Sequence, residues 1–140
     1  MNDDLTLETG SSRNIWKLLF IGILGLQALL ELGLGVALLF DFPTTLESGF
    51  GIAYNSELDI LGIALGLYLL LLTALMVLSM IWTRKSNGSG ITIGIIVGVF
   101  LVAFGLVAFF KTGDTQGILI DSLRGGLTIV FAYMAKKELK

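Results

Sequence analysis

Residues 60–82, ILGIALGLYLLLLTALMVLSMIW, decide the fold class of this chain. Polar side chains occur in this stretch only at Tyr68, Thr73 and Ser79, so it lacks the solvated face that a soluble amphipathic helix would show. An α-helix needs about 20 apolar residues to cross the hydrocarbon core of a bilayer, and this stretch is longer than that. The stretch therefore predicts a transmembrane helix.

Three further apolar stretches, at residues 18–40, 91–110 and 118–135, are long enough to cross a bilayer in the same way. Of the 140 residues, 55% are hydrophobic and 14% are charged, and the mean hydropathy is +0.91, which is far from the composition of a soluble domain. We predict an all-α fold, an integral membrane four-transmembrane-helix bundle that occupies residues 13–140. The expected helices cover residues 15–40, 58–83, 90–110 and 116–136.

The residues outside the apolar stretches predict how the chain lies in the membrane. Residues 1–12 are polar and predict a disordered cytoplasmic tail. The connection at residues 41–59 contains four acids and no basic residue. Basic residues flank the helices on the other side: Arg13, Lys17, Arg84, Lys85, Lys136, Lys137 and Lys140. Because cytoplasmic segments carry the excess of Lys and Arg, both termini are expected in the cytoplasm, and we expect the membrane to be the bacterial cytoplasmic (inner) membrane.

Glycines recur at four-residue spacing in the second and third helices, which places a smooth strip on one face of each. These glycines are Gly62 and Gly66, followed by Gly90, Gly94 and Gly98. The strips predict close packing between helices of one chain, and homodimerisation is the alternative use of the same residues.

Ionisable residues inside the apolar stretches are the informative feature for function. Gln27 and Glu31 share one face of the first helix, and Glu31 lies about 13 Å below the outer boundary at a rise of about 1.5 Å per residue. Asp121 and Arg124 enter with the fourth helix, where Arg124 is the expected partner of Glu31. Asp59 lies at the outer start of the second helix. These residues predict an outward-facing polar cluster in the bundle.

Three interpretations of this cluster are open. It can be a structural network of ion pairs and hydrogen bonds, a ligand pocket or proton site that opens outward, or a contact with a partner subunit. The chain has no Cys and no His, which excludes thiol and disulfide chemistry, iron–sulfur clusters, the usual haem ligation and His-containing metal sites. We therefore expect no metal site, no cofactor and no enzymatic activity of this chain alone.

Several short motifs lie at the ends of the predicted helices. The turn Asp41-Phe42-Pro43 precedes Ser56-Glu57-Leu58-Asp59, and the fourth helix contains Asp121-Ser122-Leu123-Arg124. These motifs resemble those of the DoxX-like small four-helix membrane proteins. The resemblance covers roughly residues 15–136. Some members of that group are subunits associated with quinone-linked oxidoreductases, and others resemble assembly chaperones of membrane proteins. The resemblance singles out Glu57, Asp59, Asp121 and Arg124 as site candidates, without a catalytic role.

The expected function is that of a small membrane accessory or assembly subunit, or of a protein that binds a lipid-like ligand of the quinone type. Its expected partners are the lipid bilayer and other membrane-protein subunits, with no nucleic acid. The alternative is a proton-coupled small-molecule transporter that uses Glu31, because small four-helix multidrug transporters also carry one membrane-embedded Glu in their first helix. The long outer loop and the Asp121–Arg124 pair depart from that transporter pattern.

Overall fold

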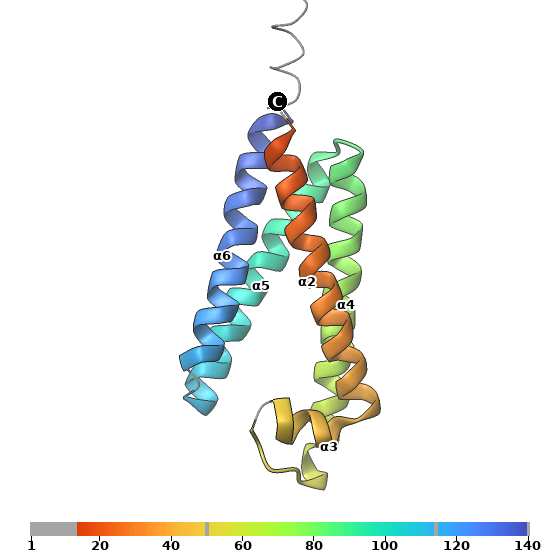
Figure 1. The fold of residues 1–140 in the computed structure, drawn as a ribbon, viewed down its shortest axis with the longest axis vertical. Helices are drawn as coiled ribbons and strands as arrows, with labels where there is room; N and C mark the ends of the chain where they lie inside the picture. Colours follow the sequence, from red (N-terminus) through yellow and green to blue (C-terminus); the bar gives the residue numbers. More distant parts are fainter. Residues whose placement is uncertain (1–13, 50, 114, 140) are drawn as a thin grey trace, which may run out of the picture. The chain divides into compact units, whose positions relative to one another are not determined.

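The computed structural model describes residues 14–49, 51–113 and 115–139, and the tail predicted at residues 1–12 lies outside them. Every regular element in the described ranges is helical. Four helices are long and apolar enough to cross a membrane (Figure 1). They are α2 (Ile15–Phe40), α4 (Asp59–Arg84), α5 (Gly88–Thr112) and α6 (Thr115–Glu138). The prediction of an all-α chain with four membrane-length helices is confirmed.

Capping groups set the ends of α5. The Asn87 side chain accepts a hydrogen bond from the Ser89 N–H group at the start of the helix. Gly113 ends it in the left-handed conformation (φ +70°), and its N–H group donates to the Phe109 carbonyl. The helix therefore includes small and polar residues at both ends that hydropathy alone leaves out.

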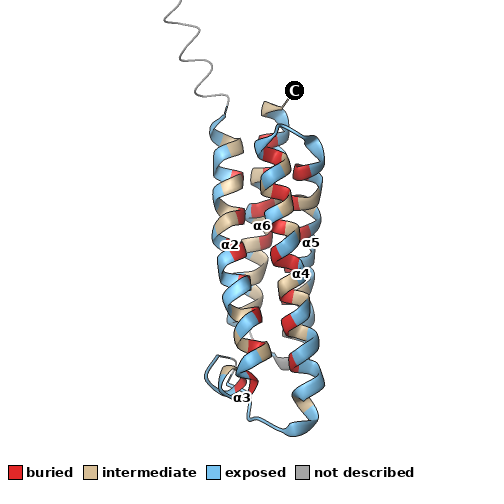
Figure 2. Cartoon of the chain, turned by 90° about the vertical axis from the view of Figure 1, so that its right-hand side faces the viewer, coloured by how far each residue is buried: buried red, intermediate tan, exposed pale blue. Residues whose placement is uncertain are grey.

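The chain forms two compact units, and α2 and α4 each contribute to both. Unit 1 comprises Met1–Gly25 and Leu75–Lys140, and unit 2 comprises Leu26–Ala74. The core of unit 1 contains buried Phe20, Leu24, Met76, Ile91, Val97 and Leu101. Buried positions recur along one side of its helices instead of around the whole circumference (Figure 2). This pattern fits helices that face one another on one side and lipid on the other.

In unit 1, α5 and α6 run side by side (Figure 1), and glycines bring their backbones together. A Cβ atom added to Gly98 would lie 2.9 Å from the Gly125 carbonyl oxygen, and one added to Gly125 would lie 2.5 Å from the Gly98 carbonyl oxygen. No side chain fits between them. The two helices therefore cross at a contact of backbone against backbone.

The other glycines of the α5 strip pack on different neighbours within unit 1. Gly90 faces the backbone of α4 at Ser79 and Thr83, and the Ser79 hydroxyl donates a hydrogen bond to the Gly90 carbonyl. Gly94 leaves room for the ring of Phe20 from α2. One strip of small residues thus packs against α4, α2 and α6 in turn, all within the same chain.

Unit 2 contains the second half of α2 and the first half of α4, joined by the short elements α3 (Phe42–Thr44), η1 (Thr45–Gly49) and η2 (Ser56–Leu58). Gly35 and Gly66 allow the two helices to approach, since a Cβ atom on either would lie 3.2 Å from the carbonyl oxygen of the other. Phe42 packs its ring on Gly62, and Tyr54 meets Phe42 edge to face with ring centroids 6.2 Å apart. The connection between α2 and α4 is therefore anchored to α4.

Candidate functional site

The polar face of α2 is the most deeply buried polar feature that the sequence predicted. Gln27 and Glu31 are 2% and 3% exposed, and Gly35 continues the same face toward α4. Leucines on the other sides of this part of α2 are exposed, as expected of residues that face lipid tails. The helix therefore turns its amide and carboxyl groups inward, where a polar group costs free energy unless it is bonded.

Tyr68 of α4 lies in unit 2 together with Glu31, where α2 and α4 approach each other at Gly35 and Gly66. Sequence reasoning noted Tyr68 only as one of the few polar side chains of its helix. A usable signal was present: as many residues separate Glu31 from the C-terminal end of α2 as separate Tyr68 from the start of α4. Equal counts at equal rise place both residues at the same depth in two neighbouring antiparallel helices.

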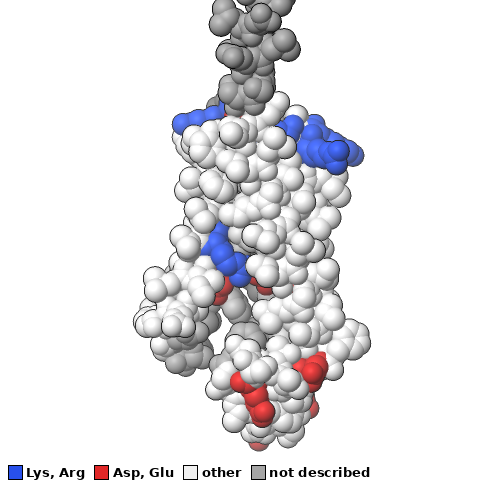
Figure 3. Space-filling view, viewed as in Figure 1, with Lys and Arg blue, Asp and Glu red and all other residues white. Residues whose placement is uncertain are grey.

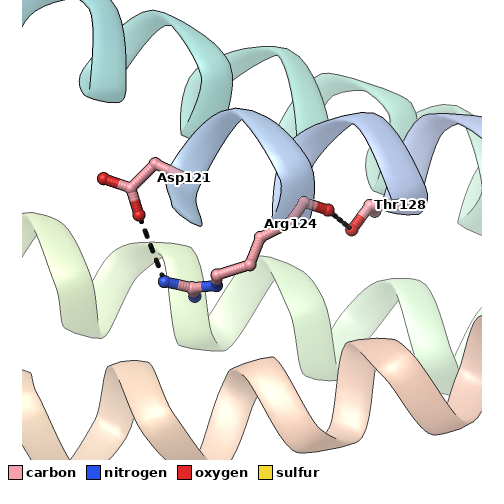
Figure 4. A network of polar contacts seen from close by, with 3 residues as sticks. All are labelled: Asp121, Arg124 and Thr128. Carbon is pink, nitrogen blue, oxygen red and sulfur yellow. Dashed lines mark hydrogen bonds and ion pairs between the residues drawn. The ribbon is translucent and has the colours of Figure 1, made fainter. Parts of the chain in front are cut away.

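Asp121 and Arg124 form an ion pair on α6 in unit 1 (Figure 4). The Arg124 Nη1 and Asp121 Oδ1 atoms are 3.4 Å apart, and the two side chains are 24% and 19% exposed. Asp121 packs on Gly105 of α5, where an added Cβ atom would lie 2.8 Å from the Asp121 Cβ atom. The Thr128 hydroxyl donates to the Arg124 carbonyl, which fixes the next turn of the same face. Gly105 was missed in the sequence because its role depends on the pairing of α5 with α6.

Glu57 lies in η2 and Asp59 begins α4, and both are exposed, in contrast to buried Glu31. The Tyr54 hydroxyl donates a 2.8 Å hydrogen bond to Asp59 Oδ1. This bond, together with desolvation and the charge of Asp59, raises the pKa of Tyr54. Glu47 accepts a hydrogen bond from the Tyr54 N–H group, so Glu47 and Asp59 both bond to Tyr54 in this loop. In unit 2, Asp59 thus acts on the loop between α2 and α4.

The structure groups the predicted site residues into two sets. Gln27, Glu31, Glu57 and Asp59 lie in unit 2, whereas Asp121 and Arg124 lie in unit 1. The pairing of Glu31 with Arg124 stays a prediction. Among the described residues, no group of three or more acidic side chains is placed to hold a metal ion.

Comparison with models of known protein families, with curated proteins and with solved structures finds no match to this chain. The DoxX-like resemblance therefore remains an expectation that rests on its short motifs. The function has to be argued from the site itself.

The side chains available for binding in unit 2 can form hydrogen bonds in a surrounding of low dielectric constant. They belong to Gln27, Glu31 and Tyr68. A carboxylate accepts, a phenol donates and accepts, and an amide does both. Each such bond is stronger in an apolar surrounding than in water, and an unmade one is costly. These three groups suit a ligand with a small polar head of carbonyl or hydroxyl oxygens.

Proposed function

We propose that this chain is an inner-membrane protein that binds the polar head of a lipid-like ligand of the quinone type at Gln27, Glu31 and Tyr68. The single observation that carries the proposal is the burial of Gln27 and Glu31 in a membrane-length helix. A purely apolar face would pack α2 on α4 at lower cost, because Gly35 and Gly66 already allow close contact. A polar ligand that bonds to these groups would account for their place in a membrane-length helix.

The quinone type is supported by the match between the groups and the ligand. Quinone carbonyl oxygens accept hydrogen bonds, which the Tyr68 hydroxyl and the Gln27 amide can donate, and quinol hydroxyls donate to a carboxylate. The isoprenoid tail would lie among exposed leucines of α2, of which Leu29 and Leu30 are 70% and 56% exposed. A ligand of this kind reaches the site from the bilayer.

Binding of a quinone with a decyl tail to the purified protein tests the proposal. We expect Glu31→Gln and Tyr68→Phe each to weaken binding about tenfold, which corresponds to about 1.4 kcal/mol and lies within the usual cost of one lost buried hydrogen bond. Thr73→Val is the matched control, since it also removes one hydroxyl from α4, and the Thr73 hydroxyl donates to the Leu69 carbonyl of its own helix. Equal binding by all three variants and the wild type would refute the proposed site.

We further propose that the protein works as an accessory or assembly subunit of other membrane proteins, with both termini in the cytoplasm. Purification in a mild detergent, followed by identification of co-purifying subunits, tests the first part. A thiol-reactive reagent that does not cross membranes tests the second. The chain has no Cys, so we expect Ser48→Cys to be labelled on intact cells and Ser89→Cys to be protected.

Proton-coupled transport is the second candidate, and buried Glu31 on the first membrane helix is the observation that favours it. In that case Glu31→Gln would abolish pH-dependent efflux of cationic dyes from proteoliposomes. We expect no such efflux from the wild type, because the site also contains Tyr68 and Gln27, which suit a neutral polar head. Efflux by the wild type that disappears in Glu31→Gln would replace our proposal.

A further inference from the structure

Three segments that are far apart in the sequence meet at one end of unit 1. The Trp16 and Lys17 N–H groups at the start of α2 donate to the Glu138 carboxylate at the end of α6, at 3.2 and 2.9 Å. The Lys17 ammonium donates a 2.9 Å hydrogen bond to the hydroxyl of Ser86, in the turn between α4 and α5. The start of α2, this turn and the end of α6 therefore form one surface, which we call the basic end.

Positive charge on the basic end is poorly compensated. Its described cations are Lys17, Arg84, Lys85, Lys136 and Lys137. In the part of the chain that the structure describes, none of these cations forms an ion pair with a carboxylate. Glu138, the nearby acid, is bonded to the backbone of α2. Figure 3 shows Lys and Arg side chains gathered at this end of unit 1.

Four of these cations fall into two groups with different surroundings. Lys137 lies over the ring of Tyr133, with its Nζ atom 4.8 Å from the ring centroid, and Lys136 is its neighbour. Lys17 is held instead by the neutral hydroxyl of Ser86, and Lys85 precedes Ser86 in the same turn. Lys17 and Lys85 thus flank one hydroxyl, Lys17 through its hydrogen bond and Lys85 as its neighbour in the chain, and both positive charges would attract an anion there.

The basic end lies at the ends of membrane-length helices, with Trp16 beside it, which is the level of the lipid headgroups. We propose that Lys17, Lys85 and Ser86 form a binding site for the phosphate of an anionic phospholipid. The phosphate oxygens accept from both ammonium groups and from the hydroxyl, while the acyl chains continue along the apolar surface of the helices. Charge complementarity is the argument for this partner, and the proposal does not depend on the ligand proposed for Glu31.

The backbone conformation of Ser86 fixes the position of its hydroxyl in this site. It is a non-glycine residue with positive φ (58°), and its N–H group donates to the Thr83 carbonyl. This conformation reverses the chain after α4 and presents the hydroxyl to Lys17. Because a glycine adopts the same φ more easily, Ser86→Gly removes the hydroxyl without strain in the turn.

Lipid retention in nanodiscs tests the proposal, with native mass spectrometry as the readout and dioleoyl phosphatidylglycerol and dioleoyl phosphatidylcholine as the two probes. The Lys17→Gln/Lys85→Gln variant should lose phosphatidylglycerol selectivity by about fivefold for each lysine, the factor that corresponds to about 1 kcal/mol per basic residue. The control variant Lys136→Gln/Lys137→Gln removes the same charge from the same end and should lose clearly less. Equal losses would show a diffuse surface potential and overturn the site.

Two further measurements separate the remaining outcomes. Ser86→Gly keeps both lysines and should lower phosphatidylglycerol retention at unchanged thermal stability; full retention would overturn the proposed three-residue site. Inorganic phosphate added alone should compete weakly, because it lacks the acyl chains that place the headgroup at this level. Complete displacement of phosphatidylglycerol by inorganic phosphate at equal concentration would show that the site takes free phosphate instead of a lipid.

Discussion

The crossing of α5 and α6 predicts opposite effects for two adjacent alanine substitutions. A Cβ atom at Gly125 would lie 2.5 Å from the Gly98 carbonyl oxygen and 2.7 Å from Val102 Cγ2, whereas one at Gly126 meets nothing within 4 Å. Both positions lie in the interior of α6. We expect Gly125→Ala to destabilise the protein and Gly126→Ala to leave it unchanged or slightly more stable.

The size of the difference follows from two contributions. Replacing Gly by Ala in a helix interior is favourable by about 1 kcal/mol, and both variants gain this amount. Only Gly125→Ala adds a clash with backbone, which cannot rotate away, so α5 and α6 have to separate; overpacking of this kind costs about 1–3 kcal/mol. The difference between the two variants therefore isolates the steric cost, about 1–3 kcal/mol.

Reversible unfolding in mixed detergent, followed by circular dichroism, measures this difference. Gly98→Ala should behave like Gly125→Ala, because its Cβ atom would lie 2.9 Å from the Gly125 carbonyl oxygen. If Gly125→Ala and Gly126→Ala unfolded at the same detergent composition, the backbone contact between α5 and α6 would be refuted.

Three other predictions concern polar groups. Asp59→Asn should lower the raised pKa of Tyr54, as measured by a tyrosinate absorbance titration. In the wild type, the hydrogen bond from Tyr54 to Asp59 stabilises the fold at pH values below the ordinary tyrosine pKa. This contribution is lost as the pH rises through the raised pKa of Tyr54. Glu138→Gln should reduce stability by about 0.3–1 kcal/mol, less at high salt, because the start of α2 loses its carboxylate. Arg124→Gln should destabilise unit 1 by about 1–3 kcal/mol, because it removes the ion pair and leaves the Asp121 carboxylate partly buried, and Asp121→Asn should restore much of the loss. Strictly additive effects in this double-mutant cycle would disprove coupling between Asp121 and Arg124.

The four membrane-length helices could be predicted because the length and apolar composition of a stretch are local properties. The burial of Gln27 and Glu31 was also predictable, since their spacing of four residues places them on one helical face that would otherwise meet lipid. The ends of α5 were harder to predict from the sequence, because they depend on the cap at Asn87 and on the left-handed conformation of Gly113.

The partners of the helices could not be predicted, because they depend on contacts between distant segments. The spacing of Gly98 indicated a contact face, but nothing local identifies Gly125 as the residue opposite. Gly105 has no neighbour at four-residue spacing, so no strip pattern marked it, and its role appears only with Asp121 against it. The contact of Glu138 with the start of α2 spans almost the whole chain and leaves no sequence signal.

The hydrogen bonds of the helix hydroxyls narrow the search for a ligand site. Thr73, Ser79 and Thr128 each donate to a backbone carbonyl, so these hydroxyls are satisfied within the fold. The carboxyl group of Glu31 lies in the interior of α2, where the backbone N–H groups are already bonded within the helix. Its donors have to come from other side chains, from water or from a ligand. Tyr68 carries such a donor and is expected at the same depth as Glu31, so the proposed polar head would form its hydrogen bonds at these two residues.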